Sequence, residues 1–197
     1  MHVLQEDKDM LPNIIITDKQ GVHTYDLISA VFERERRIFL DRPIDDTAAT
    51  EMILQLGYLD KLSDADITLF INSPGGSVSS GLAIIDAMGR CGSDIATVCT
   101  GMAASMASVI LSCGTKGKRY VTPLSEVMIH QPLGGTSGQA SDIERAAKHI
   151  THTKDVLMRI LSERTGQTVE RLTADCDRDS YFSAEEAVAY GLADSIM

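Results

Sequence analysis

Apolar and polar residues are distributed along the chain in a way that predicts strands and helices in turn. Short β-branched or apolar runs, each bounded by turn residues, predict strands at 38–40, 67–72, 95–100, 118–123 and 126–131. Apolar residues at helical spacing predict two helices between these strands, one with Val78, Leu82, Ile85 and Met88 on a single face and one with Met106, Val109, Ile110 and Cys113. Such alternation is typical of an α/β fold with a mainly parallel sheet.

The last third of the chain carries a longer helical pattern. A helix is predicted at 141–163, where the apolar stripe consists of Ile143, Ile150, Leu157 and Ile160. This stripe has no obvious partner inside one subunit, so we expect a second copy of the chain to cover it. The Gly-rich stretch PLGGTSGQ at 132–139 precedes it, and the sequence Ser183-Ala-Glu-Glu186 predicts a capping box that opens a short helix ending near Gly191. No internal repeat or linker divides the 197 residues, so we expect a single domain spanning 1–197.

Composition and charge narrow the classes of function. The 28 acidic residues outnumber the 18 Lys and Arg, and the net charge of −10 disfavours nucleic acid and anionic lipid as partners. The N-terminal residues MHVLQEDKDM do not resemble a secretory signal, and no apolar run approaches the roughly 18–20 residues of a membrane span, so we expect a cytoplasmic protein. The cysteines have no spacing typical of a metal site, which favours reduced thiols and no metal.

The first candidate for chemistry is Ser105, in the small-residue run GMAASMAS at 101–108. It lies between a predicted strand and a predicted helix, where the unpaired amides of the helix N-terminus could stabilise an oxyanion. Taken alone, Ser105 is more readily interpreted as an N-cap in a tightly packed turn.

Two further candidates follow in the chain. His130 ends a predicted strand in EVMIHQP, at a position where α/β enzymes place catalytic groups, although a lone histidine there is more often structural. The acids of DCDRD, namely Asp175, Asp177 and Asp179, precede a Tyr-Phe pair, although acid clusters are usually solvated surface.

A glycine turn is the fourth candidate. In NSPGGSVSSG, Gly75 and Gly76 lead from a predicted strand into a helix, and adjacent glycines let backbone amides approach a ligand closely. A phosphate-binding loop is the rival interpretation, but the Lys-Ser/Thr that such a loop requires does not follow the glycines. Together the four segments supply a nucleophile, a base, an acid and oxyanion donors, in the chain order Ser, His, Asp.

Longer motifs resemble a known family from about residue 13 to the C-terminus. The segments INSPGGSVSSGLAIIDAM, GMAASMAS, KGKRYVTPLSEVMIHQPLGG and DRDSYFSAEEAVAYGLADSI are together similar to the proteolytic subunit of Clp protease. The resemblance implies that Ser105 is the nucleophile, His130 the general base and Asp179 the orienting acid. It also implies that the backbone amides of Gly76 and Met106 form the oxyanion hole.

The same resemblance implies an architecture and an assembly. Members adopt a crotonase-like spiral of strand–strand–helix units, with an N-terminal axial segment at 1–20 and a protruding helical handle at about 132–163. Two heptameric rings stack into a tetradecamer, with Asp177 and Arg178 reaching across the ring–ring interface. The enclosed chamber degrades unfolded polypeptides in protein quality control. An AAA+ unfoldase feeds it and consumes the ATP, so no cofactor is expected for this chain.

The positions that match the family's ATPase docking pocket are unusual here. Thr68, Arg90 and Thr100 stand where family members carry aromatic or large apolar residues, whereas Phe70, Val98 and Tyr120 keep their apolar character. Pure rings of this chain are therefore expected to bind a Clp ATPase poorly. Ala107 also replaces a glycine that is common just after the Ser-Met pair.

Two competing interpretations remain open from the sequence. A crotonase-type acyl-CoA enzyme would share the fold and the oxyanion glycines but would not need the Ser105, His130 and Asp179 set. A weakly active or structural subunit of a mixed Clp ring is the other. The sequence does not indicate the peptide specificity, the partner ATPase, or whether the rings contain one type of subunit or two.

Overall fold

The computed structural model describes residues 12–18 and 21–197, which fall into two compact units divided after Arg37. In the first unit β1 (Asn13–Asp18) pairs antiparallel with β2 (Gly21–Asp26), and α1 (Leu27–Glu35) follows. The Asp26 carboxylate begins α1 by accepting a hydrogen bond from the Ser29 amide at 3.0 Å. The expected axial segment at 1–20 lies outside the described residues except for 12–18, and it stays a prediction.

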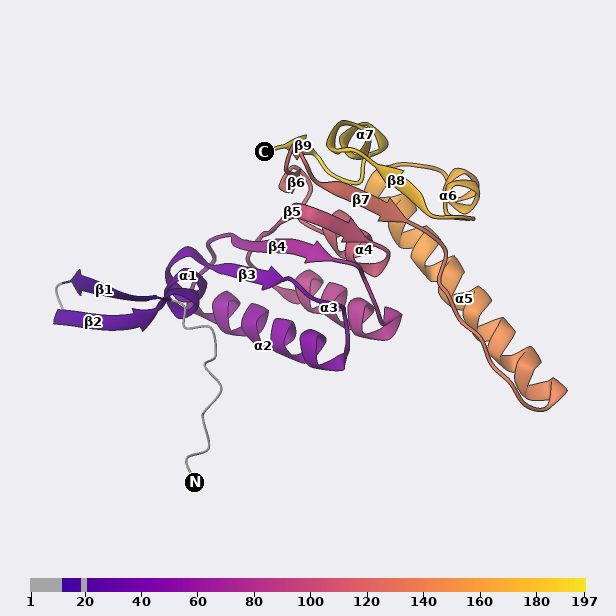
Figure 1. Ribbon diagram of the computed structural model, residues 1–197, viewed down its shortest axis with the longest axis horizontal. Helices are drawn as coiled ribbons and strands as arrows, with labels where there is room; N and C mark the ends of the chain where they lie inside the picture. The colour runs from indigo at the N-terminus through magenta and orange to yellow at the C-terminus, as the bar shows by residue number, and fades with distance from the viewer. Residues whose placement is uncertain (1–11, 19–20) are drawn as a thin grey trace, which may run out of the picture. The chain divides into compact units, whose positions relative to one another are not determined.

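The second unit, residues 38–197, is built around one sheet (Figure 1). Among the described residues its strands number seven: β3 (Arg37–Leu40), β4 (Ile67–Ser73), β5 (Ile95–Ala104), β6 (Arg119–Val121), β7 (Glu126–Ile129), β8 (Ser180–Phe182) and β9 (Ser195–Ile196). The order is β3-β4-β5-β6-β9, and β7 pairs with β5 and β8. The pairs β4/β5, β5/β6, β5/β7 and β6/β9 are parallel, which confirms an α/β fold with a mainly parallel sheet.

Helices cover the sheet and extend from it (Figure 1). They are α2 (Asp46–Leu62), α3 (Val78–Arg90), α4 (Met106–Ser112), α5 (Ala140–Thr165), α6 (Val169–Asp175) and α7 (Ala184–Tyr190). Every residue of α4 is buried, so this short helix lies in the core. Ile67, Leu69 and Ile71 of β4 are also fully buried, and each such side chain contributes roughly 1.5–3 kcal/mol to folding. Within the described ranges, no helix combines the length and apolarity that crossing a membrane requires.

Strand β5 runs past the predicted end at residue 100 and reaches Ala104. Gly101 has φ 84°, and a Cβ there would lie 2.8 Å from Asn72 Oδ1. The pairing with β4 shifts at this point, from Ile71 opposite Cys99 to Ser73 opposite Ala103. The Asn72 side chain accepts a hydrogen bond from the Met102 amide at 3.2 Å and so holds the irregular segment. As a result β5 continues to the residue before Ser105.

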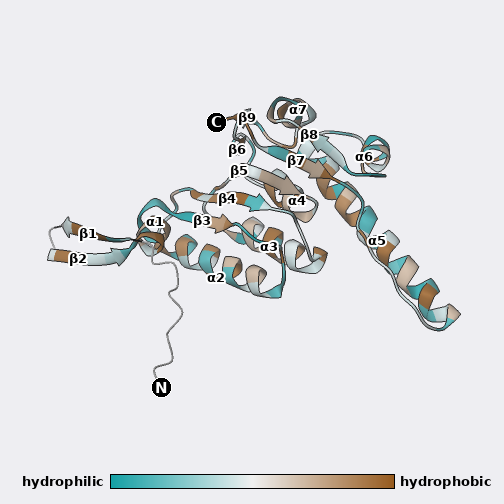
Figure 2. Cartoon of the chain, in the orientation of Figure 1, coloured by the Kyte–Doolittle hydropathy of each residue, from teal (hydrophilic) through white to brown (hydrophobic). Residues whose placement is uncertain are grey.

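Helix α5 begins one residue before the predicted 141–163 segment and ends two residues after it, at Thr165, where Gly166 with φ 78° caps it. Its C-terminal part is buried through Leu157, Met158 and Leu161, whereas Ile143 near the other end is 44% exposed. Figure 2 shows apolar positions along the helix, including the turns that project away from the sheet. The expectation that the apolar stripe has no partner inside the chain is therefore wrong for Leu157.

The predicted capping box is present at the start of α7. The Ser183 amide donates to Glu186 Oε2 at 2.9 Å, and the Glu186 amide donates to Ser183 Oγ at 3.3 Å. Hydrogen bonds from Ser183 lower the pKa of Glu186. Gly191 ends the helix with φ 95°, and a Cβ there would lie 2.3 Å from the Thr165 carbonyl oxygen, so glycine is required.

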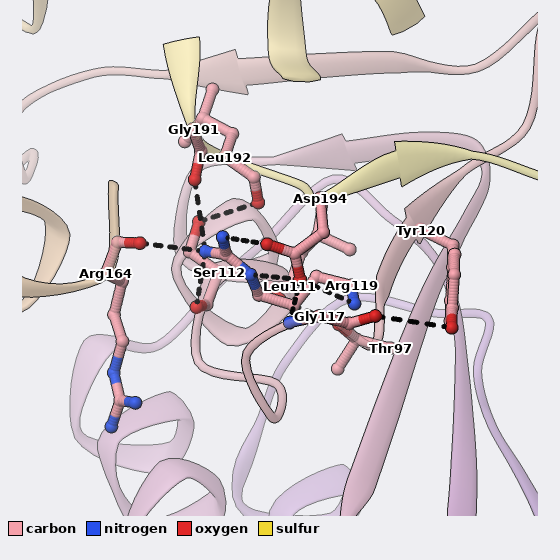
Figure 3. Close-up of polar contacts among 10 residues, drawn as sticks. All are labelled: Thr97, Leu111, Ser112, Gly117, Arg119, Tyr120, Arg164, Gly191, Leu192 and Asp194. Atoms are coloured by element: carbon pink, nitrogen blue, oxygen red, sulfur yellow. Dashed lines mark hydrogen bonds and ion pairs between the residues drawn. The ribbon is translucent and has the colours of Figure 1, made fainter. Parts of the chain in front are cut away.

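One buried arginine links the C-terminal ends of several helices (Figure 3). Arg119 Nη1 donates to the carbonyl oxygens of Ser112 in α4 at 3.3 Å, Arg164 in α5 at 2.9 Å and Gly191 after α7 at 3.0 Å. Its Nε and Nη2 atoms donate to the two carboxylate oxygens of Asp194 at 2.9 and 2.6 Å. A cation at helix C-termini is favourable because the carbonyl ends of the helix dipoles are negative.

The ion pair between Arg119 and Asp194 is shielded from water, with side-chain exposures of 6% and 18%. Burial alone would raise the pKa of Asp194, but hydrogen bonds and charge from Arg119, with the Gly117 amide, hold it below its ordinary value. A carboxyl with a lowered pKa stabilises the fold above its ordinary pKa, and this contribution is lost as the pH falls through the acidic range.

We therefore expect Asp194→Asn to lower the free energy of unfolding by about 3 kcal/mol at neutral pH, because it leaves the buried Arg119 without its counter-ion. Urea unfolding monitored by circular dichroism measures this difference, which should begin to shrink below about pH 4, where the carboxyl of the unfolded chain takes up a proton. It should be lost only as the pH falls through the lowered pKa of the folded carboxyl. The matched control is Asp94→Asn, since Asp94 is 51% exposed in its ion pair with Lys118. Equal stability of Asp194→Asn and wild type would contradict this role.

Candidate active site

Strand pairing brings the sequence-predicted residues to one place. β7 pairs parallel with β5, with Met128 opposite Ala104, and Ser105 directly follows Ala104. β7 also pairs antiparallel with β8, with Ile129 opposite Ser180. One step further in the same register, His130 faces Asp179 across the strand pair. Directly opposed residues of antiparallel strands point to the same side of the sheet, so these side chains can meet.

Hydrogen bonds join Ser105, His130 and Asp179 in a continuous chain. His130 Nε2 lies 2.8 Å from Ser105 Oγ, and His130 Nδ1 lies 2.9 Å from Asp179 Oδ1. A carboxylate accepts hydrogen bonds, so it favours the tautomer with the proton on Nδ1 and leaves Nε2 to accept the serine proton. The imidazole is largely enclosed, with 14% of its side chain exposed, whereas the Asp179 side chain is 56% exposed.

Ser105 has an unusual backbone conformation, with φ 55° and ψ −124°. A non-glycine residue with positive φ is strained and persists only where surrounding contacts hold it. Here the Ser105 amide donates to the Met128 carbonyl at 2.9 Å, and the Ser105 carbonyl accepts from the Ser108 amide at 3.0 Å. Ser105 occupies the N-cap position of α4, yet its side chain makes no capping hydrogen bond to the described helix amides and points to His130 instead.

The Gly75-Gly76 turn lies against the serine turn. Gly75 has φ 88°, and a Cβ there would lie 2.7 Å from Ser105 Cβ and 3.0 Å from the Met106 nitrogen. Gly76 has φ 153°, and a Cβ there would lie 2.2 Å from the Ile44 carbonyl oxygen. Both positions therefore require glycine, because of backbone angle and close approach.

Two backbone amides beside Ser105 are available to a ligand. Ile44 pairs with Gly76 in an isolated parallel β-bridge. The Ile44 amide donates to the Gly75 carbonyl at 2.9 Å, and the Ile44 carbonyl accepts from the Ser77 amide at 2.8 Å. The bridge therefore does not use the Gly76 amide. Met106 is the first residue of α4, and an amide at this position has no acceptor inside its own helix. The turn thus presents donors at the positive end of a helix next to a nucleophilic side chain.

A narrow hollow next to Ser105 and His130 has mostly apolar walls. Its apolar lining comes from α3, α4, β7, α5 and the segment after His130, namely Val78, Met106, Val109, Ile129, Pro132, Leu157, Met158 and Leu161. The contribution of α5 was missed in the sequence, where Leu157 was assigned to an unpartnered stripe. The close spacing of Leu157, Met158 and Leu161 near the end of that helix was the signal for a buried face.

The predicted ring-contact residues lie on the loop before Asp179. Arg178 and Asp177 form an exposed ion pair at 3.6 Å, with side-chain exposures of 85% and 62%. Arg178 Nη1 also donates to the Asp177 carbonyl at 2.8 Å. The Gln131 side chain donates to the same carbonyl at 3.1 Å, which ties this loop to the residue that follows His130.

Most of the predicted docking positions share one face of the sheet. Phe70, Val98 and Tyr120 are in register across β4, β5 and β6, and Phe70 stacks on Phe39 at a centroid distance of 5.3 Å. Val98 is fully buried in the middle of this row. Phe39 is 48% exposed and was missed, although its place between Ile38 and Leu40 in a predicted strand puts its side chain on the face opposite to theirs.

Of the other docking positions, two lie on the strands of this row and one lies on a helix. Thr68 and Thr100 are partly exposed residues of β4 and β5. Arg90 is the last residue of α3 and lines a separate hollow against α2, together with Ile53 and Cys91. It therefore does not join the row formed by Phe70 and Tyr120.

The cysteine thiols and the possible metal ligands of the described residues were the other candidates for chemistry. Cys91, Cys99, Cys113 and Cys176 all lie within the described residues and carry free thiols. Burial raises the pKa of Cys99, Cys113 and Cys176 to about 11, which keeps these thiols protonated at neutral pH. In residues 12–18 and 21–197, no three His, Cys, Asp or Glu side chains are grouped in a way that could hold a metal ion.

Comparison with protein families agrees with the fold. The family model for Clp protease matches residues 19–197, a span that contains the glycine turn, Ser105, His130 and Asp179. The parallel sheet with its helices is consistent with the crotonase-like fold of that family. Since the match extends over most of the chain, the chain belongs to the Clp protease family and is a serine-type peptidase of that kind.

Proposed function

We propose that this chain is an endopeptidase in which Ser105 is the nucleophile, His130 the general base and Asp179 the acid that orients the imidazole. The observation that carries the proposal is the continuous pair of hydrogen bonds, at 2.8 and 2.9 Å, beside a glycine turn that packs closely against Ser105. A serine hydroxyl is a weak nucleophile unless a positioned base takes its proton, and this arrangement provides that base.

In the acylation step Ser105 Oγ attacks the carbonyl carbon of the scissile peptide bond while its proton moves to His130 Nε2. The carbonyl oxygen becomes an oxyanion, and the amides of Gly76 and Met106 donate hydrogen bonds to it. Asp179 stabilises the imidazolium that forms, without itself taking the proton. His130 then gives the proton to the leaving amine, the C–N bond breaks, and an ester to Ser105 remains.

Deacylation repeats these roles with water as the nucleophile. His130 Nε2 takes a proton from the water, whose oxygen attacks the ester carbon, and the same amides stabilise the second oxyanion. The proton returns to Ser105 Oγ as the C–O bond breaks, which releases the new carboxyl end of the substrate. No step requires a metal or an organic cofactor, so we propose that this chain uses none.

The substrate is proposed to be an unfolded polypeptide that binds beside the Gly-rich segment 132–139. The walls of the hollow next to Ser105 are mostly apolar, which favours contact with an apolar substrate side chain, since burial of apolar surface is favourable. The segment 132–139 belongs to no described strand or helix, so a substrate in extended conformation could pair with its backbone. The Gln139 carbonyl is excluded from this pairing, because it accepts from the Asp142 and Ile143 amides.

The assembly is proposed to be two stacked heptameric rings that enclose the active sites. The exposed part of α5, with Ile143 44% exposed, offers an apolar surface that a second ring would cover. An AAA+ unfoldase would supply unfolded chains and use the ATP. The partly exposed Thr68 and Thr100 weaken an apolar docking surface, and this favours rings that include a second type of subunit.

Ser105→Ala should abolish labelling by a fluorophosphonate and lower kcat for a short fluorogenic peptide by at least about 10⁴-fold, because no other group replaces the nucleophile. Labelling followed by peptide mapping, together with steady-state kinetics, measures both effects. Ser195→Ala is the matched control, since Ser195 is an exposed residue of β9. Comparable activity in Ser105→Ala and wild type would disprove the assigned nucleophile.

Gly76→Ala should lower kcat by about 10²–10³-fold, because the added methyl group collides with Ile44 and moves one oxyanion donor. Gly89→Ala is the control, since a Cβ at Gly89 would meet nothing within 4 Å. Kinetics with a short peptide, on protein with a matching circular dichroism spectrum, measures the effect. If Gly76→Ala kept the wild-type kcat, its amide would have no role in the reaction.

Arg178→Ala should increase the fraction of single rings and lower the peptidase rate, because it removes a cation proposed to reach across the ring interface. Native mass spectrometry measures the ring content, and Lys116→Ala serves as a control with the same loss of charge at an exposed position. If both quantities stayed unchanged, the Arg178 and Asp177 pair would be an ordinary exposed ion pair, worth about 0–1 kcal/mol.

A further inference from the structure

Asp179 lies on a short loop, residues 176–179, which connects α6 to β8 and is called the acid loop below. More than half of the Asp179 side chain is exposed, at 56%, and its carboxylate contacts His130. An exposed carboxylate keeps one orientation only if the backbone that carries it is held in place. The contacts at the two ends of the acid loop therefore matter for the proposed triad.

Both ends of the acid loop meet at Asp175, the last residue of α6. Ser180, the first residue of β8, donates its hydroxyl to the Asp175 carbonyl at 2.6 Å and so closes the loop. The backbone amide of Gln131 donates to the Cys176 carbonyl at 2.7 Å and so joins the loop to the residue after His130. The position of Asp175 thus sets where the loop begins and where it ends.

The Asp175 carboxylate is held from a distant part of the chain. The Tyr190 hydroxyl, at the end of α7, donates to Asp175 Oδ2 at 2.6 Å, and Tyr190 is only 6% exposed. Arg171 adds a cation, with its Nε 3.4 Å from the same oxygen and its guanidinium 5.0 Å above the Tyr190 ring. The Tyr190 ring also contacts Phe182, the last residue of β8, at a centroid distance of 4.8 Å.

Tyr190 therefore touches both sides of the acid loop, through its hydroxyl before the loop and through its ring after it. Burial raises the pKa of Tyr190 well above its ordinary value, and the hydrogen bond to Asp175 and the Asp175 charge add to this effect. The charged and titratable groups around the hydroxyl are Asp175, Arg171 and Cys176. The hydroxyl stays protonated throughout the working range of the enzyme and remains a hydrogen-bond donor.

We propose that Tyr190 is a positioning residue for the peptidase reaction, which holds the acid loop through Asp175 and Phe182 so that Asp179 stays within hydrogen-bond distance of His130. This rests on the proposed triad and assigns a further residue to it. Tyr190 does not touch the reacting groups itself. Its effect passes through the backbone of residues 176–179 to the orientation of one carboxylate.

Tyr190→Phe tests the proposal most directly, because it removes the hydroxyl and keeps the ring against Phe182 and Arg171. We expect kcat/KM for a short peptide, per site titrated by fluorophosphonate, to fall about tenfold, the usual effect of losing a hydrogen bond to a charged acceptor. The fall should lie in kcat rather than KM. The acidic limb of the pH profile should move to lower pH, since an imidazolium with a misplaced carboxylate loses its proton more easily.

Tyr181→Phe is the matched control, since Tyr181 lies on β8 but is 54% exposed. A purely structural role for Tyr190 would reduce the number of titratable sites and leave the rate per site and the pH profile unchanged. Either that result or full wild-type activity per site in Tyr190→Phe would overturn the proposal. Absence of fluorophosphonate labelling in the wild type would instead overturn the proposed nucleophile, so the two failures are distinguishable.

A second pair of variants keeps the test decisive if Tyr190→Phe does not fold. Asp175→Ala removes the acceptor of the Tyr190 hydroxyl, and we expect the same tenfold loss and the same shift of the pH profile. Asp175→Asn keeps an oxygen that accepts this hydrogen bond, and we expect it to restore most of the activity. Equal activities of Asp175→Ala and Asp175→Asn, both per titrated site, would contradict the proposal.

Discussion

Strand β7 is hydrogen-bonded to two neighbours at once, parallel to β5 and antiparallel to β8, and the register of these pairings places every proposed reacting side chain. Ser105 follows the β5 residue opposite Met128, and Asp179 precedes the β8 residue opposite Ile129. Side chains alternate between the faces of a strand, so a slip of one residue between β7 and β8 would turn Asp179 away from His130. The chemistry therefore depends on main-chain hydrogen bonds as much as on the side chains.

This register is maintained by contacts from outside the strands. Ser105 keeps a strained backbone, with φ 55°, because the buried helix α4 and the Met128 carbonyl fix its two sides. Arg119 holds the C-terminal end of α4 together with those of α5 and α7, and Asp194 balances its charge. Gln131 connects the strand that carries the base to the loop that carries the acid. Several of these contacts join segments that are distant in the sequence, such as Arg119 with Gly191 and Gln131 with Asp177, which explains why a small domain can hold a precise site.

The sequence alone predicted the parts of this structure that depend on local patterns. Strand runs, the helix faces and the capping box at Ser183 follow from short-range periodicity and hydrogen bonding, and the small-residue turn at Ser105 and the glycine turn are local motifs as well. The β7/β8 register could not be predicted, because β8 has only the residues Ser180–Phe182 and no alternating pattern. The continuation of β5 past Gly101 depends on the distant Asn72 side chain. The burial of Leu157 depends on how α5 docks, which its own stripe does not reveal.

The most direct test of the account is a crystal structure of the protein after reaction with a fluorophosphonate, which mimics the first tetrahedral intermediate. The account predicts a phosphorus bonded to Ser105 Oγ, with the phosphoryl oxygen accepting hydrogen bonds from the Gly76 and Met106 amides at about 2.7–3.1 Å. It also predicts that Asp179 still contacts His130 Nδ1. Phosphorus on another residue, or a phosphoryl oxygen that points away from both amides, would contradict the account.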